Sequence, residues 1–115
     1  MQRLKKEKNS NLSLDMNMKE PDYIVHRFDN IEMPLFFGHI SKSLRAEGLC
    51  EDPHSDDPEI WVENRLGKRR KLNVLIEEMC HAFFFDEPEY KVRKFSAELG
   101  KIIYNRFLKQ GAIEQ

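Results

Sequence analysis

The sequence predicts an α+β fold, with a small sheet of two or three strands packed on two principal helices. Three observations lead to this prediction. The stretch Tyr23–Phe28 (YIVHRF) is β-branched and aromatic, as strands are. Residues 48–66 hold two short apolar pieces separated by Asp, Pro, His and Ser, which is typical of a β-hairpin. Residues 71–109 contain two long apolar patterns separated near Pro88, which is typical of two consecutive helices.

Length and composition fit one small domain. The chain has 115 residues, of which 40% are hydrophobic, enough for one modest core. Residues 1–20 are polar, rich in Lys and Asn and without sustained periodicity, so we expect a disordered N-terminal tail followed by a single domain over residues 21–115. Nineteen Lys and Arg against twenty Asp and Glu give a net charge of −1, which predicts no global attraction to nucleic acid or to anionic membranes.

Cysteine usage and hydropathy predict a soluble protein of the cytoplasm. Cys50 and Cys80 form no Cys-x-x-Cys pair and follow no apolar signal segment, which indicates a reducing compartment rather than a disulfide scaffold or a zinc ribbon. No apolar run approaches the roughly 20 residues that a membrane span needs. We therefore expect no membrane partner.

The remaining elements are predicted from spacing and end signals. Phe36, Ile40 and Leu44 lie at helical spacing, which predicts a short helix within residues 34–48 despite an internal glycine. A second helix covers Lys71–Phe85. A third begins with Asp86 as N-cap and ends near Lys109, before a glycine at position 111. Its core-facing stripe is predicted to contain Val92, Phe95, Leu99, Ile102 or Ile103, and Phe107.

The helix Lys71–Phe85 is apolar nearly all round, yet it carries three ionisable groups, Glu77, Glu78 and His81. Buried charges need partners or a metal. Glu77 and His81 lie four residues apart and project on one side, the geometry by which a His-Glu-x-x-His helix presents two ligands to one zinc ion. A simple ion pair between Glu77 and His81 is the alternative. On the third helix, Glu98 lies at the border of the predicted stripe, where it either faces His81 or reaches solvent.

Several positions at fixed spacing carry a family resemblance. The stretch Gly48–Leu108 resembles the small zincin-like, SprT-related metallopeptidases that many bacteriophages encode and that occur in marine metagenomic sequence. The matching positions are Gly48, Cys50, Ile60, Trp61, Leu75, Ile76, Glu78, His81, Ala82, Asp86, Val92 and Glu98. The resemblance implies a minimal zincin-like domain and a metal-dependent hydrolase that cleaves peptide or protein in the host cytoplasm.

The same resemblance implies the roles of the site residues. Glu77, His81 and Glu98 are the implied metal ligands, with Glu77 in place of the usual first histidine, and Glu78 is the implied base that deprotonates the attacking water. Zinc is the implied ion, although a carboxylate-rich set suits Mn or Fe better than a histidine-rich one. The extra negative charge weakens the metal as a Lewis acid. The alternative is therefore a non-catalytic binding or structural module of the same fold that has lost its first ligand.

Three further features have a functional interpretation and a simpler alternative. The basic run Lys68, Arg69, Arg70 and Lys71 is able to contact nucleic-acid phosphates, but it lacks interleaved aromatic residues, and a solvated turn is the alternative. His54 lies in the acidic loop CEDPHSDDPE and is expected to be exposed. Glu78-x-x-His81 also matches a di-iron motif, but that site needs a second such motif in a four-helix bundle.

Overall fold

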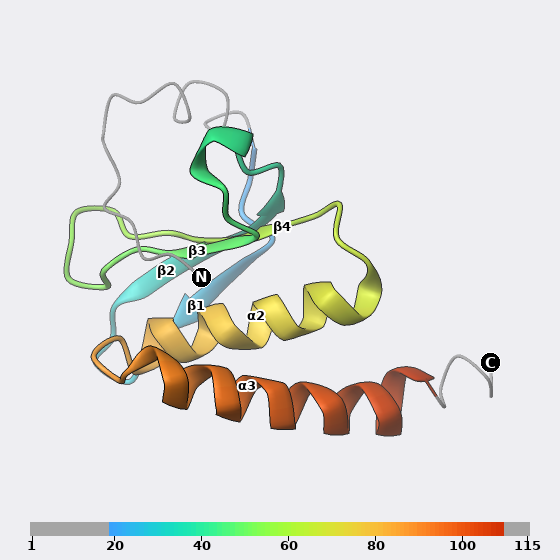
Figure 1. Ribbon diagram of the computed structural model, residues 1–115. Helices are drawn as coiled ribbons and strands as arrows, with labels where there is room; N and C mark the ends of the chain where they lie inside the picture. The colour runs from blue at the N-terminus through green and yellow to red at the C-terminus, as the bar shows by residue number, and fades with distance from the viewer. Residues whose placement is uncertain (1–18, 110–115) are drawn as a thin grey trace.

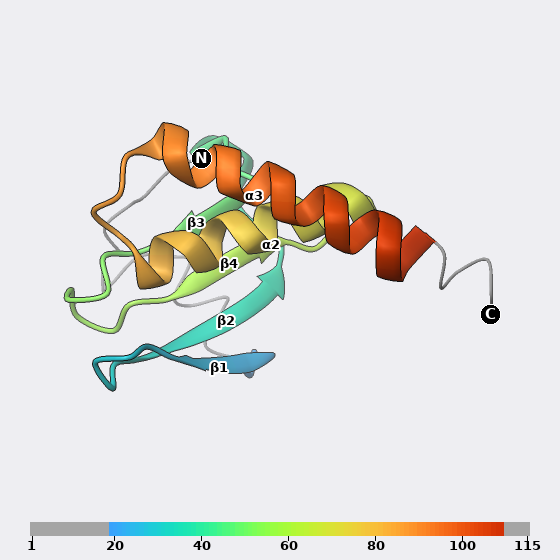
Figure 2. The same ribbon diagram turned by 90° about the horizontal axis from the view of Figure 1, so that it is seen from below.

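Three layers make up residues 19–109, the part of the chain that the computed structural model describes (Figure 1). Helix α2 (Lys68–Phe83) lies against a four-stranded sheet, and helix α3 (Glu89–Ile103) packs on the opposite side of α2 (Figure 2). The predicted α+β class is confirmed, and the sheet is larger than the two or three strands expected. Most of the predicted tail lies outside the described residues. Within them, neither helix combines the length and apolar character that a bilayer crossing requires.

The sheet consists of two antiparallel hairpins joined by a parallel contact. Its strands are β1 (Tyr23–His26), β2 (Glu32–Gly38), β3 (Gly48–Cys50) and β4 (Ile60–Glu63), in the order β1-β2-β4-β3. The parallel pair β2 and β4 sets Leu35 opposite Ile60. The predicted first strand and the hairpin formed by β3 and β4 are confirmed.

The prediction of a short helix within residues 34–48 is wrong. This stretch forms most of β2 and a single 3₁₀ turn, η1 (Lys42–Leu44). Both faces of β2 are covered, because Met33 and Leu35 join the core beneath α2 while Phe36 stacks on Trp61 on the other face, with ring centroids 4.4 Å apart. A strand covered on both sides loses the alternation of apolar and polar residues by which strands are recognised.

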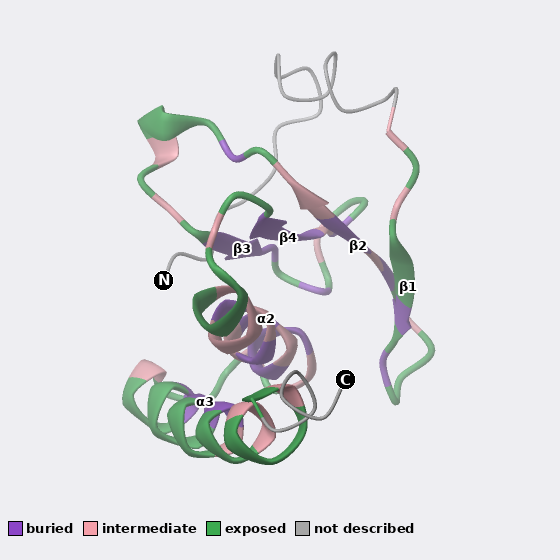
Figure 3. Ribbon diagram, turned by 90° about the vertical axis from the view of Figure 1, so that its right-hand side faces the viewer, coloured by how far each residue is buried: buried purple, intermediate pink, exposed green. Residues whose placement is uncertain are grey.

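Helix α2 is buried on two sides, as its apolar pattern predicted (Figure 3). Val74 and Ala82 belong to the core shared with the sheet, whereas Ile76 and Cys80 pack against Val92 of α3. The last turn of α2 is also anchored to the β1–β2 turn. There Arg27 donates a hydrogen bond to the Ala82 carbonyl and forms an ion pair with Asp29.

Helix α3 begins later than predicted and turns a different face inward. Pro88 occupies the N-cap position, so the prediction of Asp86 as N-cap is wrong. Beyond Ile103 the chain continues as a π-helical segment, η2 (Tyr104–Lys109), which reaches the predicted end. The buried residues are Val92, Ser96 and Gly100, while three members of the predicted stripe, Phe95, Ile102 and Phe107, are exposed.

Side-chain size explains the orientation of α3. A Cβ atom at Gly100 would lie 1.9 Å from Oδ1 of Asn73 on α2, so the glycine permits a close approach of the two helices. Ser96, one turn earlier, is buried against Cys80. Small residues therefore occupy the contact, and the larger Phe95 and Ile102 lie to its side.

Candidate functional site

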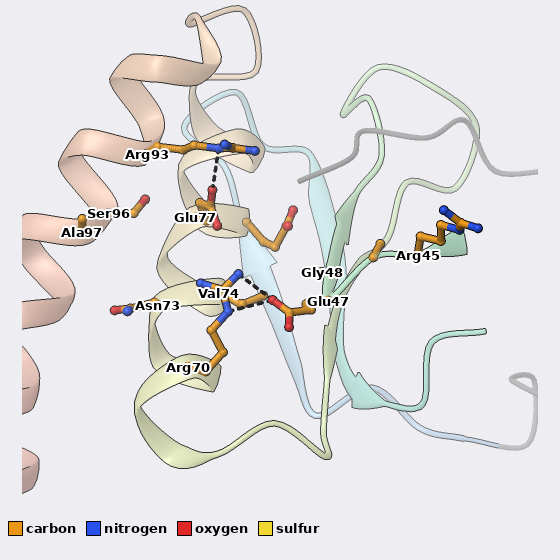
Figure 4. Close-up of a pocket in the computed structure, with 12 residues that line it drawn as sticks. Arg45, Glu47, Gly48, Arg70, Asn73, Val74, Glu77, Arg93, Ser96 and Ala97 are labelled. Carbon is orange, nitrogen blue, oxygen red and sulfur yellow. Dashed lines mark hydrogen bonds and ion pairs between the residues drawn. The ribbon is translucent and has the colours of Figure 1, made fainter. Parts of the chain in front are cut away.

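A cleft of about 570 Å³ is lined by residues of α2, of α3 and of the segment that leads into β3 (Figure 4). Its lining is about half polar, and its charged groups are arginines and carboxylates drawn from three parts of the chain. The residues that line it are Arg45, Ala46, Glu47, Gly48, Arg70, Asn73, Val74, Glu77, Glu78, Arg93, Ser96 and Ala97. Two of the predicted site residues, Glu77 and Glu78, are thus among the residues of the cleft wall.

Gly48 makes room for the carboxylate of Glu78. A Cβ atom at position 48 would lie 2.5 Å from Oε2 of Glu78 and 2.6 Å from Cγ1 of Val74, so any side chain there would collide with both. The outer strand β3 therefore approaches α2 more closely than a larger residue permits. This contact fixes Glu78 between the strand and its own helix.

Glu78 and His81 are both fully buried. They lie three residues apart on α2, hence on the same side of the helix. Nε2 of His81 lies 3.3 Å from Oε1 of Glu89, the first residue of α3. The site thus contains a buried acid and a buried imidazole next to each other, and a carboxylate from the second helix reaches the imidazole.

Glu77 is an acid of the cleft wall whose pKa is shifted upward. Burial raises the pKa of its carboxyl group, the nearby Glu89 raises it further, and Arg93 opposes the change. Nε of Arg93 lies 3.5 Å from Oε2 of Glu77 and 3.4 Å from Oε2 of Glu89. The four side chains therefore form a chain of contacts from Glu77 through Arg93 and Glu89 to His81.

The structure places Glu98 away from this chain. Its carboxylate pairs with Lys94 at 3.3 Å and with Lys101 at 3.6 Å on the outer surface of α3, and the Lys94 hydrogen bond with the charge of Lys101 lowers its pKa. The physical reason is the orientation of α3. Glu98 follows the buried Ser96 by two residues and so points roughly the opposite way. The predicted convergence of Glu77, His81 and Glu98 therefore does not occur, and Glu89 is the acid of α3 beside His81.

Sequence reasoning missed Glu89 and Arg93. The signal that identifies Glu89 is the shortness of the connection between the helices. Only a few residues separate Phe83 from Glu89, so the first turn of α3 must lie beside the last turn of α2, where His81 is.

The set of donors suits a divalent metal in its chemistry, although not in its present arrangement. Two carboxylates and one imidazole are ligands that zinc, manganese and iron accept. Within residues 19–109, no three His, Cys, Asp or Glu side chains lie close enough together to hold an ion as they stand. Between Glu77 and Glu89 the positive charge is that of Arg93.

The other predicted groups lie outside the cleft or at its rim. The basic run Lys68, Arg69, Arg70 and Lys71 forms the first turn of α2. There Arg70 donates to Oε1 of Glu47 at 2.7 Å and Arg69 lies over the ring of Tyr104. Nucleic-acid contact by this run stays a prediction. His54 is exposed, as expected, and lies near Asp29 and Asp52.

Comparison of the chain with models of protein families, with curated proteins and with solved structures finds no match.

Proposed function

We propose that the chain is a metal-dependent hydrolase of the metallopeptidase-like class, with Glu77, His81 and Glu89 as metal ligands and Glu78 as general base. The observation that supports the proposal is the chain of contacts that links the three proposed ligands. His81 lies 3.3 Å from Glu89, and a single cation, Arg93, lies within 3.5 Å of both Glu77 and Glu89. The ligand set keeps Glu77 and His81 of the family resemblance and replaces Glu98 by Glu89.

Each residue has a task in this proposal. Glu77, His81 and Glu89 hold the ion, and Glu78, beside Gly48, accepts a proton from the attacking water. When bound, a divalent ion such as zinc supplies a Lewis acid that polarises the carbonyl of a peptide bond. The outer strand β3 borders the cleft through Gly48, which allows an extended peptide to lie along it. The proposed substrate is accordingly a peptide or protein segment.

Glu77→His tests whether the cleft binds metal. Imidazole is a better zinc ligand than carboxylate at this position, so we expect zinc affinity to rise at least about tenfold in the variant. The melting temperature in zinc should rise as well, because an ion that binds only the folded state stabilises it. Calorimetric titration with zinc measures the affinity. An unchanged affinity together with a lower melting temperature would show that Glu77 belongs to a structural ion pair.

A matched pair of glutamate variants tests which acid of α3 is the ligand. In the Glu77→His background, Glu89→Gln should weaken zinc binding by about tenfold or more, while Glu98→Gln should leave it unchanged. Both substitutions remove one negative charge from α3, so they differ only in position. Equal losses would count against the proposed ligand set, and a loss confined to Glu98→Gln would restore the set that the resemblance implies.

Glu78→Gln separates chemistry from binding. We expect zinc affinity to stay near that of the parent while hydrolysis of fluorescein-labelled casein falls by about a hundredfold or more, since general bases contribute on this scale. If the parent binds zinc but never cleaves casein or a peptide library, the non-catalytic binding module is the better description. The pairing of Arg93 with Glu77 and Glu89 is the observation that favours this second candidate.

A further inference from the structure

We propose that Arg93 is a built-in counter-ion that occupies the cation position between Glu77 and Glu89 and must swing out before a divalent metal binds there. This inference rests on the proposed function, because it concerns access to the same ligands. It assigns to Arg93 a role that the residue pattern alone did not suggest. Arg93 thereby sets the threshold of metal concentration at which the cleft fills.

The first argument is the position of the guanidinium group. Figure 4 shows Arg93 reaching from α3 toward Glu77 on α2. Its Nε atom lies 3.5 Å from Glu77 and 3.4 Å from Glu89, so one cation neutralises acids from both helices. A divalent ion that used the same two carboxylates would stand close to this guanidinium. Two cations that share one pair of ligands repel each other, and binding of one opposes binding of the other.

The second argument is that the two acids need a cation when no metal is bound. Glu77 is only 13% exposed, and Glu89 is near enough to disfavour its charge. Removing Arg93 would leave two partly buried carboxylates next to each other, which is costly. The counter-ion therefore stabilises the metal-free protein.

The third argument is that Arg93 is able to leave. Its side chain is 59% exposed, and its contacts of 3.4 and 3.5 Å are longer than a well-formed hydrogen bond. A long, exposed arginine reaches water by rotation about its own side-chain bonds, without movement of the helix. The ion pair is thus strong enough to neutralise the acids and weak enough to be displaced.

The test compares Arg93→Gln with Arg70→Gln. Arg70 lines the same cleft, is 56% exposed and pairs with Glu47, so the control removes an equal charge from the same cavity. We expect Arg93→Gln to raise zinc affinity at least about tenfold and Arg70→Gln to change it by less than about threefold, because Arg93 contacts both Glu77 and Glu89, whereas the charge of Arg70 acts on Glu77 more weakly than that of Arg93. Arg93→Lys, which keeps the charge, should stay within about threefold of the parent.

Melting temperatures provide a second readout. Arg93→Gln should melt below the parent without metal and above it in saturating zinc, since the substitution removes the counter-ion but frees the ligands. A purely structural arginine would lower both temperatures alike. Isothermal calorimetry gives the zinc affinities, and thermal scans give the melting temperatures, of the parent and of Arg93→Gln, Arg93→Lys and Arg70→Gln.

The outcomes separate this inference from the proposed function. If the parent binds zinc and Arg93→Gln binds it no better than Arg70→Gln does, the counter-ion role is wrong and the metal site stands. If neither Arg93→Gln nor Glu77→His binds zinc, manganese or iron, both proposals fall. A gain specific to Arg93→Gln supports both.

Discussion

Glu63 at the end of β4 and Glu77 on α2 are both largely buried carboxylates, 10% and 13% exposed, but their surroundings act on them in opposite directions. Burial disfavours the charge of Glu63 too. There, however, backbone N–H groups of Ile40 and Arg65, with the Arg65 side chain and His39, lower its pKa to about 2. Around Glu77, burial dominates and the pKa is raised.

The opposite pKa shifts of Glu63 and Glu77 indicate different roles for the two carboxylates. Four donors hold Glu63 and tie the loop after β2 to the turn after β4, so its charge stabilises the fold. Glu77 carries a charge that the fold does not fully compensate. Uncompensated charge in a cleft is typical of functional sites, where a ligand supplies the missing interaction. Substitutions in the two regions test this difference.

Glu63→Gln should lower the free energy of unfolding at pH 7 by about 2–3 kcal/mol, because charge-assisted hydrogen bonds are lost. The pH dependence should change too. A carboxyl group whose pKa falls from 4.5 to about 2 on folding contributes stability above pH 4.5 that disappears as the pH falls toward 2. Urea denaturation at several pH values measures both effects. A variant that keeps the parental decline below pH 4.5 would contradict the role of Glu63.

Gly48→Ala should cost about 1–3 kcal/mol, since the added methyl group overlaps both Glu78 and Val74. Gly67→Ala is the matched control, because a Cβ at Gly67 meets nothing within 4 Å. Urea denaturation at neutral pH compares the two variants. Equal losses would mean that the close approach of β3 to α2 is not what Gly48 provides.

Glu77→Gln should raise the stability of the metal-free protein slightly at neutral pH, by under about 1 kcal/mol, since a poorly compensated charge is removed at the expense of an exposed ion pair. This change in stability is opposite in sign to the one expected for Glu63→Gln. Because folding raises the pKa of Glu77, the folded parent takes up its proton before the unfolded chain does, and the advantage of the variant shrinks as the pH falls. The difference between parent and variant at pH 7 and pH 5 shows whether this holds.

Glu98→Gln should have the smallest effect. Its carboxylate is exposed and paired only with lysines of its own helix, and such pairs rarely change stability measurably. Thermal unfolding of the variant should coincide with that of the parent. A clear loss of stability would indicate that Glu98 interacts with more than Lys94 and Lys101.

The parts of the fold that the sequence predicts correctly are those with local signals. The hairpin of β3 and β4 has turn residues between two apolar pieces, and α2 has an apolar pattern on all sides, as a helix between two layers must. Strand β2 escapes prediction because it is covered on both faces and pairs with β4, which is distant in sequence. No local pattern encodes that parallel contact.

In the candidate site, too, only the part that depends on local spacing could be predicted from the sequence. The projection of Glu77 and His81 on one side of α2 follows from their spacing, whereas the choice of acid on α3 depends on the rotation of that helix. We predicted the rotation from hydrophobicity, which favours Phe95 and Ile102 at the contact. Close packing against Asn73 instead selects the small residues Ser96 and Gly100, and the rotation they impose brings Glu89 inward and turns Glu98 outward.

Among the described residues, those that line the cleft all fall between Arg45 and Ala97, so the hairpin of β1 and β2 contributes none of them. That hairpin supports the cleft elements from outside, through the pairing of β2 with β4, through the core that Met33 and Leu35 share with α2, and through the hydrogen bond from Arg27 to Ala82. Residues 45–97 therefore supply the lining of the cleft, and the hairpin of β1 and β2 supports them. In evolution or in design, the exposed positions of this hairpin are free to vary as long as it preserves the pairing with β4, the core residues Met33 and Leu35, and the anchor at the last turn of α2.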